Sequence, residues 1–572
     1  MSLTTTPTDS PAAERNGHVS AENALVLKKN LASLKKGADL GTVSESQWTH
    51  WQDHLASREG RPALAKVTSA FAFESLLWGL PNGQLPEETR ELLRNLGAAK
   101  RKKRAASRSG STELASNWLA ERSDREMDVA LAVECLTWAH SMPALAAFSE
   151  QSLWCELLLT LSRIAHDAAA IHSEAKPLIH ALAAGELPLA LAYVLPEVEL
   201  GLGVKGAKVQ LSEGLLSVLD GEGQFAFAHA PVARGLLGCW TRCQLLGKAM
   251  KKRPLDSEAR AHLKWFLRHT IAAMRADGTP MLVTKAATTN DLKLLEIAFD
   301  ALGKTTEHKL ANLNLPSRNK PGKQGKRTPK RLPNPATNSE WAEMALLRSS
   351  WNGDSPRLLL DYSGENVRTE LVTGKHVVWS GECSPVVRVD GETLALTTPW
   401  SEVCWHSDDD VDFIEIEAGL SGGWKCQRQF LLARQDRFLL AADVLLGPQP
   451  AKVEYQCDWP IGKKLHVSGE KETTECVISK GKKNVTRVLP LALPEWKSDG
   501  RRSGLLSEAG GALRYSLARE GKHLYAPLLL DLDQDRMKYD YTWRQLSVGR
   551  NLEAVPLDEA VGYRVQLRLD QW

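Results

Sequence analysis

The stretch "VDFIEIEAGLSGGWKCQRQFLLARQDRFLLAADVLLG", residues 411 to 447, decides the fold class of the second half of this chain. Apolar and polar residues alternate along much of it, as they do on a strand that buries one face. The Gly-rich "SGG" at 421–423 and the polar "RQD" at 434–436 have the composition of turns. The stretch therefore predicts three consecutive strands of an antiparallel meander.

The same alternation continues on both sides of this meander. Three further stretches show it: "SPVVRVDGETLALTTP" (384–399), which turns at Asp390-Gly391; "LSEAGGALRYSLARE" (506–520), which turns at Gly510-Gly511; and "AVGYRVQLRLDQW" (560–572). Strands that follow one another this closely, joined by turn dipeptides, are typical of stacked antiparallel sheets. Residues 339–572 are therefore predicted to form a large antiparallel β-sandwich.

Upstream of residue 304 the apolar residues recur with helical spacing instead. In "PVARGLLGCWTRCQLLGKAM" (231–250), Leu236, Cys239, Trp240 and Cys243 lie on one helix face. The next such stretch, "PLDSEARAHLKWFLRHTIAAMRADG" (254–278), opens with capping residues and closes with a glycine. Residues 41–303 are therefore predicted to be a helical domain, and the chain as a whole an α+β multidomain protein.

Two segments are expected to lie outside the domains. Residues 1–40 contain Ser, Thr and Pro with little periodicity and are expected to be a disordered tail. Residues 304–338 contain "PSRNKPGKQGKRTPKRLPNPATN", in which lysine and arginine alternate with proline and glycine. This composition predicts an exposed basic linker between the two domains.

The overall charge excludes a field that would draw the whole protein to nucleic acid. The 72 Lys and Arg residues nearly balance the 69 Asp and Glu residues, for a formal net charge of +3. Only the basic stretches 100–108 and 318–331 would bind a polyanion locally, and no aromatic side chains are interleaved with them to stack on bases. Nucleic-acid binding is therefore the weakest of the functional hypotheses.

The sequence is expected to belong to a soluble, cytoplasmic protein. Its nine cysteines include no CxxC pair and are expected to be reduced or buried thiols. The first 20 residues lack the basic start and apolar run of a secretory signal. No apolar stretch approaches the roughly 20 residues of a membrane helix, so no membrane contact is expected.

Four stretches resemble the heparinase II/III-like polysaccharide lyases, of which this chain would be a divergent member. They are "WAEMALLRSSW" (341–351), "LLLDYSG" (358–364), "CQRQFLLARQDRFLLAADVL" (426–445) with Arg428 and Asp443, and "FLRHTIAAMRADGTPML" (266–282). The first two are similar to the strands that open the family's sandwich, and the third to a later pair of strands. The fourth is similar to a helix that ends in Asp-Gly. The resemblance implies an α/α toroid-like helical domain followed by the sandwich.

The family resemblance also implies β-elimination across a uronic acid in a polysaccharide. This reaction needs a side chain that neutralises the carboxylate and a base that removes the neighbouring proton. Tyr193, His269 and His406 are the candidate catalytic residues. The family's His-x-His-x-Asp pattern is altered, because "ENVRTELVTGKH" (365–376) contains only His376.

The stretch "CWHSDDDVDFIEIEAGL" (404–420) allows two interpretations. His406, Asp408 and Asp410 stand at every second position, so on a strand their side chains share one face. One imidazole and two carboxylates suit a divalent metal such as Ca or Zn. The same residues also suit an acidic turn before a buried strand, and the altered histidine pattern favours the turn.

Large aromatic side chains are frequent in the predicted sandwich. Of the 18 tryptophans, Trp405 and Trp424 are candidate platforms for sugar rings, with Arg428 as a partner for an anionic group. The leading hypothesis is a protein that acts on or binds an acidic, uronate-containing polysaccharide, by β-elimination if it is an enzyme. The alternative is a non-catalytic relative that serves as a carbohydrate- or protein-binding module. The sequence leaves the oligomeric state open.

Overall fold

The computed structural model describes most of the 572 residues. The described ranges are 45–57, 62–68, 74–80, 85–99, 106–122, 125–198, 201–283, 287–318, 332–551, 553–556, 559–567 and 570–571. The expected tail at 1–40 and most of the basic stretches at 100–108 and 318–331 lie outside these ranges. The chain divides into two compact units, each made of separate segments: unit 1 is Met1–Gly214 with Arg242–Asp256, and unit 2 is Leu215–Thr241 with Ser257–Trp572.

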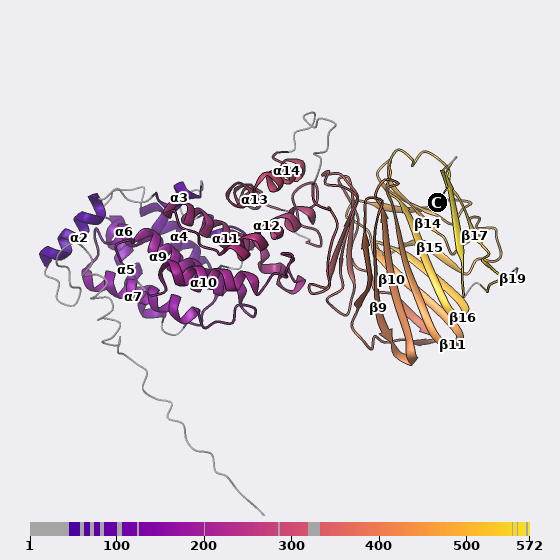
Figure 1. The fold of residues 1–572 in the computed structure, drawn as a ribbon, viewed down its shortest axis with the longest axis horizontal. Coiled ribbons are helices and arrows are strands. Elements are labelled where there is room, and N and C mark those ends of the chain that lie inside the picture. Colours follow the sequence, from indigo (N-terminus) through magenta and orange to yellow (C-terminus); the bar gives the residue numbers. More distant parts are fainter. Residues whose placement is uncertain are drawn as a thin grey trace, which may run out of the picture. The chain divides into compact units, whose positions relative to one another are not determined.

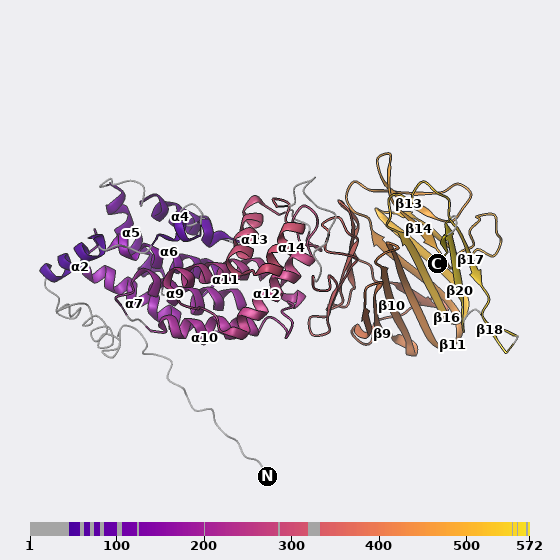
Figure 2. The ribbon, with the colours of Figure 1, turned by 45° about the horizontal axis from the view of Figure 1, so that its top comes forward.

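Helices dominate the chain up to residue 314, as the periodicity predicts (Figures 1 and 2). Their bounds are α2 Glu45–Ser57, α3 Leu64–Val67, η1 Glu74–Leu77, α4 Glu87–Ala99, α5 Ala106–Glu121, α6 Val129–Leu145, α7 Gln151–Ala168, α8 Pro177–His180, the π-helical segment η3 Ala181–Glu186, α9 Leu187–Val194, α10 Gly203–Leu216, η4 Phe227–His229, α11 Ala230–Met250, α12 Ser257–Ala272, α13 Thr289–Leu302 and α14 Thr305–Asn314.

Helix α6 is the centre of unit 1. Asp128 caps its first turn by accepting a hydrogen bond from the Leu131 N–H at 2.7 Å, and nearly all its residues are buried. The buried carboxylate of Glu134 accepts hydrogen bonds from Thr89 Oγ1, Trp118 Nε1 and the Arg125 guanidinium. One fully paired carboxylate thus fastens α4 and α5 to α6.

A second apolar helical stretch, Pro177–Val194, joins α8, η3 and α9 into one run of 18 residues. By length and composition alone it would cross a membrane, contrary to the expectation that no apolar stretch of the sequence is long enough. In the structure 83% of this run is buried inside the protein. It is therefore placed as a core helix of unit 1.

Strands follow from residue 337 onward. Their bounds are β1 Thr337–Ser339, β2 Met344–Arg348, β3 Arg357–Asp361, β4 Arg368–Thr373, β5 His376–Glu382, β6 Val386–Val389, β7 Glu392–Thr393, β8 Ser401–Ser407, β9 Val411–Leu420, β10 Trp424–Ala433, β11 Phe438–Pro460, β12 His466–Gly469, β13 Cys476–Lys480, β14 Lys483–Pro490, β15 Gly504–Ala509, β16 Ala512–Asp531, β17 Thr542–Leu546, β18 Gly549–Arg550, β19 Glu553–Ala554, β20 Gly562–Leu567 and β21 Asp570–Gln571, with a short 3-10 turn, η5 Ser421–Gly423.

These strands form antiparallel sheets. Strands β1 to β5 make a five-stranded sheet in chain order, and an eleven-stranded sheet contains the path β12-β13-β14-β16-β11-β10-β9-β8. The meander predicted from residues 411–447 is correct, because β9, β10 and β11 pair in that order and turn at 421–423 and 434–437. The fold class α+β is thereby confirmed.

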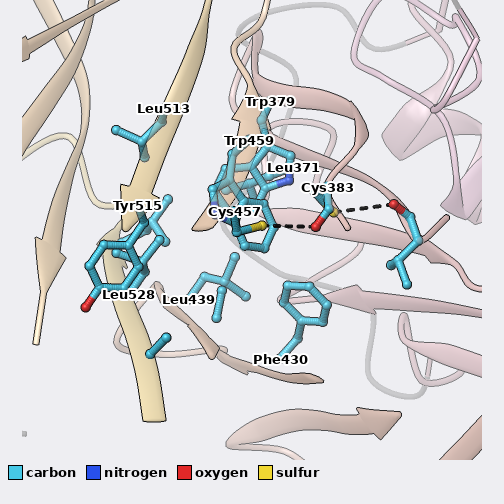
Figure 3. Close-up of a cluster of buried hydrophobic side chains, with 14 of the residues drawn as sticks. Leu371, Trp379, Cys383, Phe430, Leu439, Cys457, Trp459, Leu513, Tyr515 and Leu528 are labelled. Atoms are coloured by element: carbon cyan, nitrogen blue, oxygen red, sulfur yellow. Dashed lines mark hydrogen bonds between the residues drawn. The ribbon is translucent and has the colours of Figure 1, made fainter. Parts of the chain in front are cut away.

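One large apolar cluster contains buried side chains of both sheets (Figure 3). The five-stranded sheet contributes Leu371 and Trp379, and the eleven-stranded sheet contributes Phe430, Leu439 and Trp459 among others. Alternate residues of β11 serve different clusters: Leu439 belongs to this one, whereas Leu440 packs against a second cluster formed with β17 and β20. This part of β11 is therefore covered on both faces, which explains why apolar residues are nearly continuous in "FLLAADVLL" instead of alternating with polar ones.

Within unit 2, the five-stranded sheet also carries buried charges that meet the end of helix α12. Arg348 Nη1 donates to the Ala272 carbonyl at 2.8 Å, and Arg357 Nη1 donates to the Met274 carbonyl at 2.7 Å. Both arginines are almost fully buried, and no carboxylate pairs with either among the described residues. Carbonyl oxygens at the end of the α12 segment therefore accept from both guanidinium groups, and the negative charges of Asp354 and Glu370 also act on Arg357. Burial lowers the pKa of both guanidinium groups, most strongly for Arg348.

A buried carboxylate of the same sheet makes a further link to the α12 segment. Glu370 on β4 accepts two hydrogen bonds of 2.6 Å from the Arg275 guanidinium, which lies just after α12. It also accepts the Leu282 N–H at 2.8 Å and the Ser380 hydroxyl at 2.8 Å. The sheet and this helical segment are therefore joined by paired polar groups inside unit 2.

The structure differs from the expected domain ranges at the segment 304–338. Its first third is not a linker, because Thr305–Asn314 forms helix α14. At the start of this helix the Lys304 N–H donates a hydrogen bond to Glu307 Oε2 at 2.7 Å. Leu310 and Ala311 of the helix are buried. The charged and polar composition concealed an apolar stripe only one residue wide at each turn.

Candidate functional site

A pocket of about 370 Å³ lies between helices α12 and α14 of unit 2. Its lining residues are Ala261, Lys264, Trp265, Arg268, Lys304, Thr305, Thr306 and Glu307. The volume suits a small ligand or one to two sugar units of a longer chain. Three of the lining residues are cations and one is a carboxylate, so the pocket is positively charged.

The α12 side of the pocket follows from residue spacing. Ala261, Lys264, Trp265 and Arg268 stand at intervals of three and four residues, which places them on one helix face. The opposite face carries Leu263 and Leu267, which are fully buried. The buried face fixes the helix, and it therefore holds the cationic face toward the pocket.

The α14 side supplies the first turn of a helix. Thr305 and Thr306 line the pocket here, and the backbone N–H groups of a first turn have no partner within their helix. Lys304 precedes the turn, and its side chain is exposed. A helix start next to cationic side chains favours an anion.

The positive charge of Lys264 is repelled by other cations in and near the pocket. Burial and then the positive charges of Lys304 and Arg260 lower the pKa of Lys264. Within the part of the chain that the structure describes, no carboxylate lies within ion-pair distance of Lys264 or Lys304. An anionic ligand would relieve this repulsion, and the relief would contribute to its binding.

The acid of the pocket is already engaged. Glu307 is almost fully buried, and its Oε1 accepts a hydrogen bond from Arg268 Nε at 2.8 Å and lies 2.7 Å from Arg268 Nη2 in an ion pair. Burial opposes its ionisation, but the Lys304 N–H and Arg268 outweigh it and lower the pKa of Glu307. Arg268, which lines the pocket, is thereby held by Glu307 with 29% of its side chain exposed.

Trp265 forms an apolar wall of the pocket. Its ring lies 5.3 Å from the ring of His262, and a tight turn, 219–225, packs against its base. In that turn Gly223 has φ +77, and a Cβ added there would lie 2.6 Å from the His262 carbonyl oxygen. Only glycine fits this close approach, so the turn and Trp265 are held together.

The predicted catalytic residues are not gathered in this pocket. Tyr193 lies in α9 of unit 1, buried, with its hydroxyl donating to the Pro62 carbonyl at 2.6 Å. His269 lies in α12 of unit 2, with Nε2 at 3.0 Å from the Glu222 carbonyl oxygen. Burial lowers the pKa of His269 and keeps the ring neutral near pH 7. Its contact fastens α12 to the turn that supports Trp265.

His406 lies near the end of strand β8, and the two aspartates occupy the turn between β8 and β9. His406 Nε2 lies 3.0 Å from Asp408 Oδ2, while Asp408 Oδ1 accepts the N–H groups of Asp410 and Val411 at 2.8 Å. These hydrogen bonds, led by that from His406, lower the pKa of Asp408 to about 2. Asp410 accepts from Gln435 instead, so the three groups do not converge on one point for a Ca or Zn ion. The geometry favours the acidic-turn interpretation.

Asp412, which follows in the same stretch, has a structural role. Asp412 is fully buried and accepts hydrogen bonds from the Arg348 N–H at 3.0 Å, from Ser407 Oγ at 2.6 Å and from Arg434 Nη2 at 2.5 Å. It therefore ties β9 to β2 and to the turn after β10.

The predicted substrate-binding residues lie at the large β core. Trp424 is 4% exposed and packs on Gly447, where a Cβ would meet its ring at 2.4 Å. Arg428 is 1% exposed and donates to Asp443 through Nε and Nη2, both at 2.7 Å. Trp405 is half-buried against the same core. Their contacts favour a structural part for Trp424 and Arg428.

Sequence reasoning missed the cations of the pocket. Arg260, Lys264 and Arg268 stand four residues apart, and this basic stripe on a helix was a signal that could have been read. Lys304 gave no such signal, because it belongs to a segment expected to be a linker. The pocket exists only where α14 packs against α12, and that contact is not encoded in local spacing.

Comparison with known proteins gives matches in structure alone. No family model matches the sequence, and no curated protein matches it. A solved heparinase III structure gives a TM-score of 0.63 at 12% identity and covers 96% of each chain. The heparan sulfate lyase HepC from Pedobacter heparinus gives 0.62 at 11% identity and covers 97% of each chain. A further heparinase III structure gives 0.58 at 10% identity over 97% of this chain and 98% of that one. The resemblance predicted from the sequence is thus confirmed at the level of the fold.

Proposed function

We propose that this chain, whose fold is that of the heparinase III structures, binds an acidic, uronate-containing polysaccharide in the pocket between α12 and α14. The observation that carries the proposal is the charge of this pocket. Lys264, Arg268 and Lys304 line it together with the first turn of α14, and Glu307 is its one lining carboxylate. Carboxylate or sulfate groups of a glycan would pair with these cations, and the indole of Trp265 would contact a sugar ring.

The names of the structural neighbours support the choice of ligand. Two are heparinase III structures and one is a heparan sulfate lyase, so they act on anionic glycans. We extend the likeness to the finer architecture, in which the helical part is an α/α toroid-like domain and the strands a β-sandwich. We also propose a cytoplasmic location. The alternative to an enzyme is a non-catalytic relative that serves as a carbohydrate- or protein-binding module.

The test of binding is calorimetric titration of the purified chain with a heparan sulfate tetrasaccharide. Lys264→Gln with Lys304→Gln should weaken the affinity about tenfold or more, because two positive contacts are lost. The matched control is Lys293→Gln with Lys309→Gln, which removes the same charge from α13 and α14 outside the pocket lining. Equal affinities for the two double variants would refute the proposal.

A second function, β-elimination, is favoured by the placement of two cations in the same pocket. Lys264 and Arg268 line it one helical turn apart, so one amine could accept a proton while the guanidinium binds a uronate carboxylate, and burial with the neighbouring positive charges lowers the pKa of Lys264 in the direction that a base requires. Lys264 would remove the proton at C5, next to the carboxylate, and the C4–O glycosidic bond would break as the C4–C5 double bond forms. The leaving oxygen would take a proton from water, and the new double bond, conjugated with the carboxylate, would absorb ultraviolet light.

A conservative variant separates binding from elimination. Lys264→Arg keeps the positive charge but cannot accept a proton near neutral pH, so glycan affinity should stay within about twofold while product absorbance disappears. The other candidates, Tyr193, His269 and His406, are tested by Tyr193→Phe, His269→Gln and His406→Gln. Loss of absorbance in any of these variants, with normal turnover by Lys264→Arg, would place the elimination at that residue instead.

A further inference from the structure

Two hairpin turns with similar sequences come together in the β region of unit 2. The β4–β5 turn is Gly374-Lys375, between the paired residues Thr373 and His376, and the β13–β14 turn is Gly481-Lys482, between Lys480 and Lys483. Both glycines have positive φ, +58 and +59, as two-residue hairpins require. Strands β5 and β14 belong to different sheets and contact one another.

The lysine side chains of both turns lie close enough to His376 to affect its pKa. Burial, and then the positive charges of Lys480, Lys483 and Lys375, lower the pKa of His376. The four lysines Lys375, Lys480, Lys482 and Lys483 are exposed, and within the described residues none of them forms an ion pair. The neighbouring Asp354 contributes its carbonyl oxygen, which accepts the Gly374 N–H at 2.9 Å.

A third segment adds two lysines beside them. After β11, Gly462 donates its N–H to the Val378 carbonyl of β5 at 3.0 Å, and a Cβ on Gly462 would collide with the Val377 carbonyl. This contact brings the exposed Lys463 and Lys464 next to the start of β5. Strand β12, which follows, pairs with β13 and leads back to the β13–β14 turn.

We propose that these three segments form a second anion-binding surface, the turn-lysine surface, which holds a distant part of the same acidic polysaccharide chain. It consists of Lys375, Lys463, Lys464, Lys480, Lys482 and Lys483. The inference rests on the proposed function for the choice of a glycan. The surface is separate from the pocket between α12 and α14 and shares none of its lining residues.

The chemistry of the surface favours a linear glycan over other polyanions. The three segments, "TGKH", "GKKLH" and "SKGKKN", contain no aromatic side chain other than histidine to stack on nucleic-acid bases. None of the large apolar side chains exposed by the described residues lies in them, so nothing would insert into a membrane. Lysines on short turns bind by charge, and a polymer with an anionic group on each repeat would satisfy several of them at once.

The experiment compares two ligands with the full-length chain. Long heparin polymer and a heparin tetrasaccharide are titrated at several salt concentrations against the wild type and against Lys480→Gln/Lys482→Gln/Lys483→Gln. The matched control is Lys425→Gln/Lys452→Gln/Lys522→Gln, which removes three exposed lysines from β10, β11 and β16. We expect the surface variant to bind polymer about tenfold more weakly, with a shallower salt dependence, and to bind tetrasaccharide normally.

The outcomes separate this inference from the proposed function. Polymer affinity equal to that of the control variant overturns the surface. If Lys264→Gln with Lys304→Gln binds tetrasaccharide normally while the surface variant still loses polymer, the pocket proposal fails and the surface stands. Duplex DNA and phosphatidylserine vesicles serve as rival ligands. Binding of either as tightly as heparin at equal salt, with the same loss in the surface variant, overturns the assignment to a glycan.

Discussion

At the scale of single residues, the buried pair Arg428 and Asp443 shows how the β core includes charge. The guanidinium is bonded twice to the carboxylate, and Tyr455 Oη donates to the same carboxylate at 2.6 Å. Arg428 Nη1 also donates to the Cys383 carbonyl at 2.6 Å, to which Cys457 Sγ donates in turn (Figure 3). Burial raises the pKa of the Cys457 thiol, so it stays protonated and unreactive.

Removing one partner of this pair should be far more damaging than removing both. Asp443→Ala leaves a guanidinium buried without its counter-charge, and we expect it to lower the free energy of unfolding by about 3–5 kcal/mol. Arg428→Met with Asp443→Leu should regain most of that loss. Urea unfolding followed by tryptophan fluorescence measures both variants. A loss below about 1 kcal/mol for Asp443→Ala would contradict the expectation.

His180 should make the stability of unit 1 sensitive to mild acid. Burial lowers the pKa of this ring, which is 3% exposed and lies 3.0 Å from Gln210 Oε1 through Nε2. The unfolded chain therefore takes up a proton first as the pH falls through about 6.5, so stability is complete above that pH and is lost below it. We expect the melting temperature to fall between pH 7.5 and pH 5.5, and to fall less for His180→Gln. Parallel curves for the two proteins would exclude His180 as the cause.

At the scale of elements, helix α12 has two roles, one on its pocket-lining face and one at its C-terminal end. One face carries Lys264, Trp265 and Arg268 to the pocket, and its C-terminal end receives Arg348 and Arg357 from the sheet. The sequence predicted this helix, because residues 254–278 have helical spacing, capping residues at the start and Gly278 after the end. It did not predict the arginine caps, since these come from strands about 80 residues away.

The arginine caps should control the last turn of α12. Arg348→Met removes the donors to the Ala272 carbonyl and to Asn314 Oδ1, and we expect a loss of about 2 kcal/mol. Amide hydrogen exchange should become faster in the last turn of α12 and stay unchanged in α6. Unchanged exchange at α12 would mean that water replaces the lost donors without cost.

The turn that supports Trp265 allows a matched pair of glycine variants. Gly223→Ala should strain the positive φ and collide with the His262 carbonyl, at a cost of about 1–3 kcal/mol and with weaker glycan binding. Gly221→Ala lies in the same turn, where an added Cβ would meet nothing within 4 Å, and should be almost neutral. Thermal melting and tetrasaccharide titration distinguish them. Equal effects of the two substitutions would show that the turn moves freely.

At the scale of the whole molecule, the sequence predicted an order of helices followed by antiparallel strands, and this order is correct. Local period was sufficient for that, since it reports which side of an element is buried. It was insufficient for the pocket, which unites residues of α12 with Lys304 through tertiary packing. It also suggested Trp424 and Arg428 as surface residues, because composition cannot tell an aromatic or charged side chain in a core from one on a surface.

Polar contacts between α12 and the sheet should keep unit 2 intact after the chain is cut. A protease site inserted after Gly325, between α14 and β1, would allow the covalent link between the helices and the strands of unit 2 to be cut. Because Arg348, Arg357 and Glu370 bind the α12 segment, we expect the cut fragments to elute together in size-exclusion chromatography. Fragments that elute separately under native conditions would show that these contacts are too weak to hold the unit.

These same contacts bear on how such a protein can change over evolution. A gene rearrangement that moved the strands alone into another protein would leave two buried arginines and a buried glutamate without their partners. Recombination at the boundary between helices and strands would thus produce an unstable product and be removed by selection. The strands and the α12 segment must descend together, and a substitution at one side of their contact should be tolerated only after a compensating change at the other.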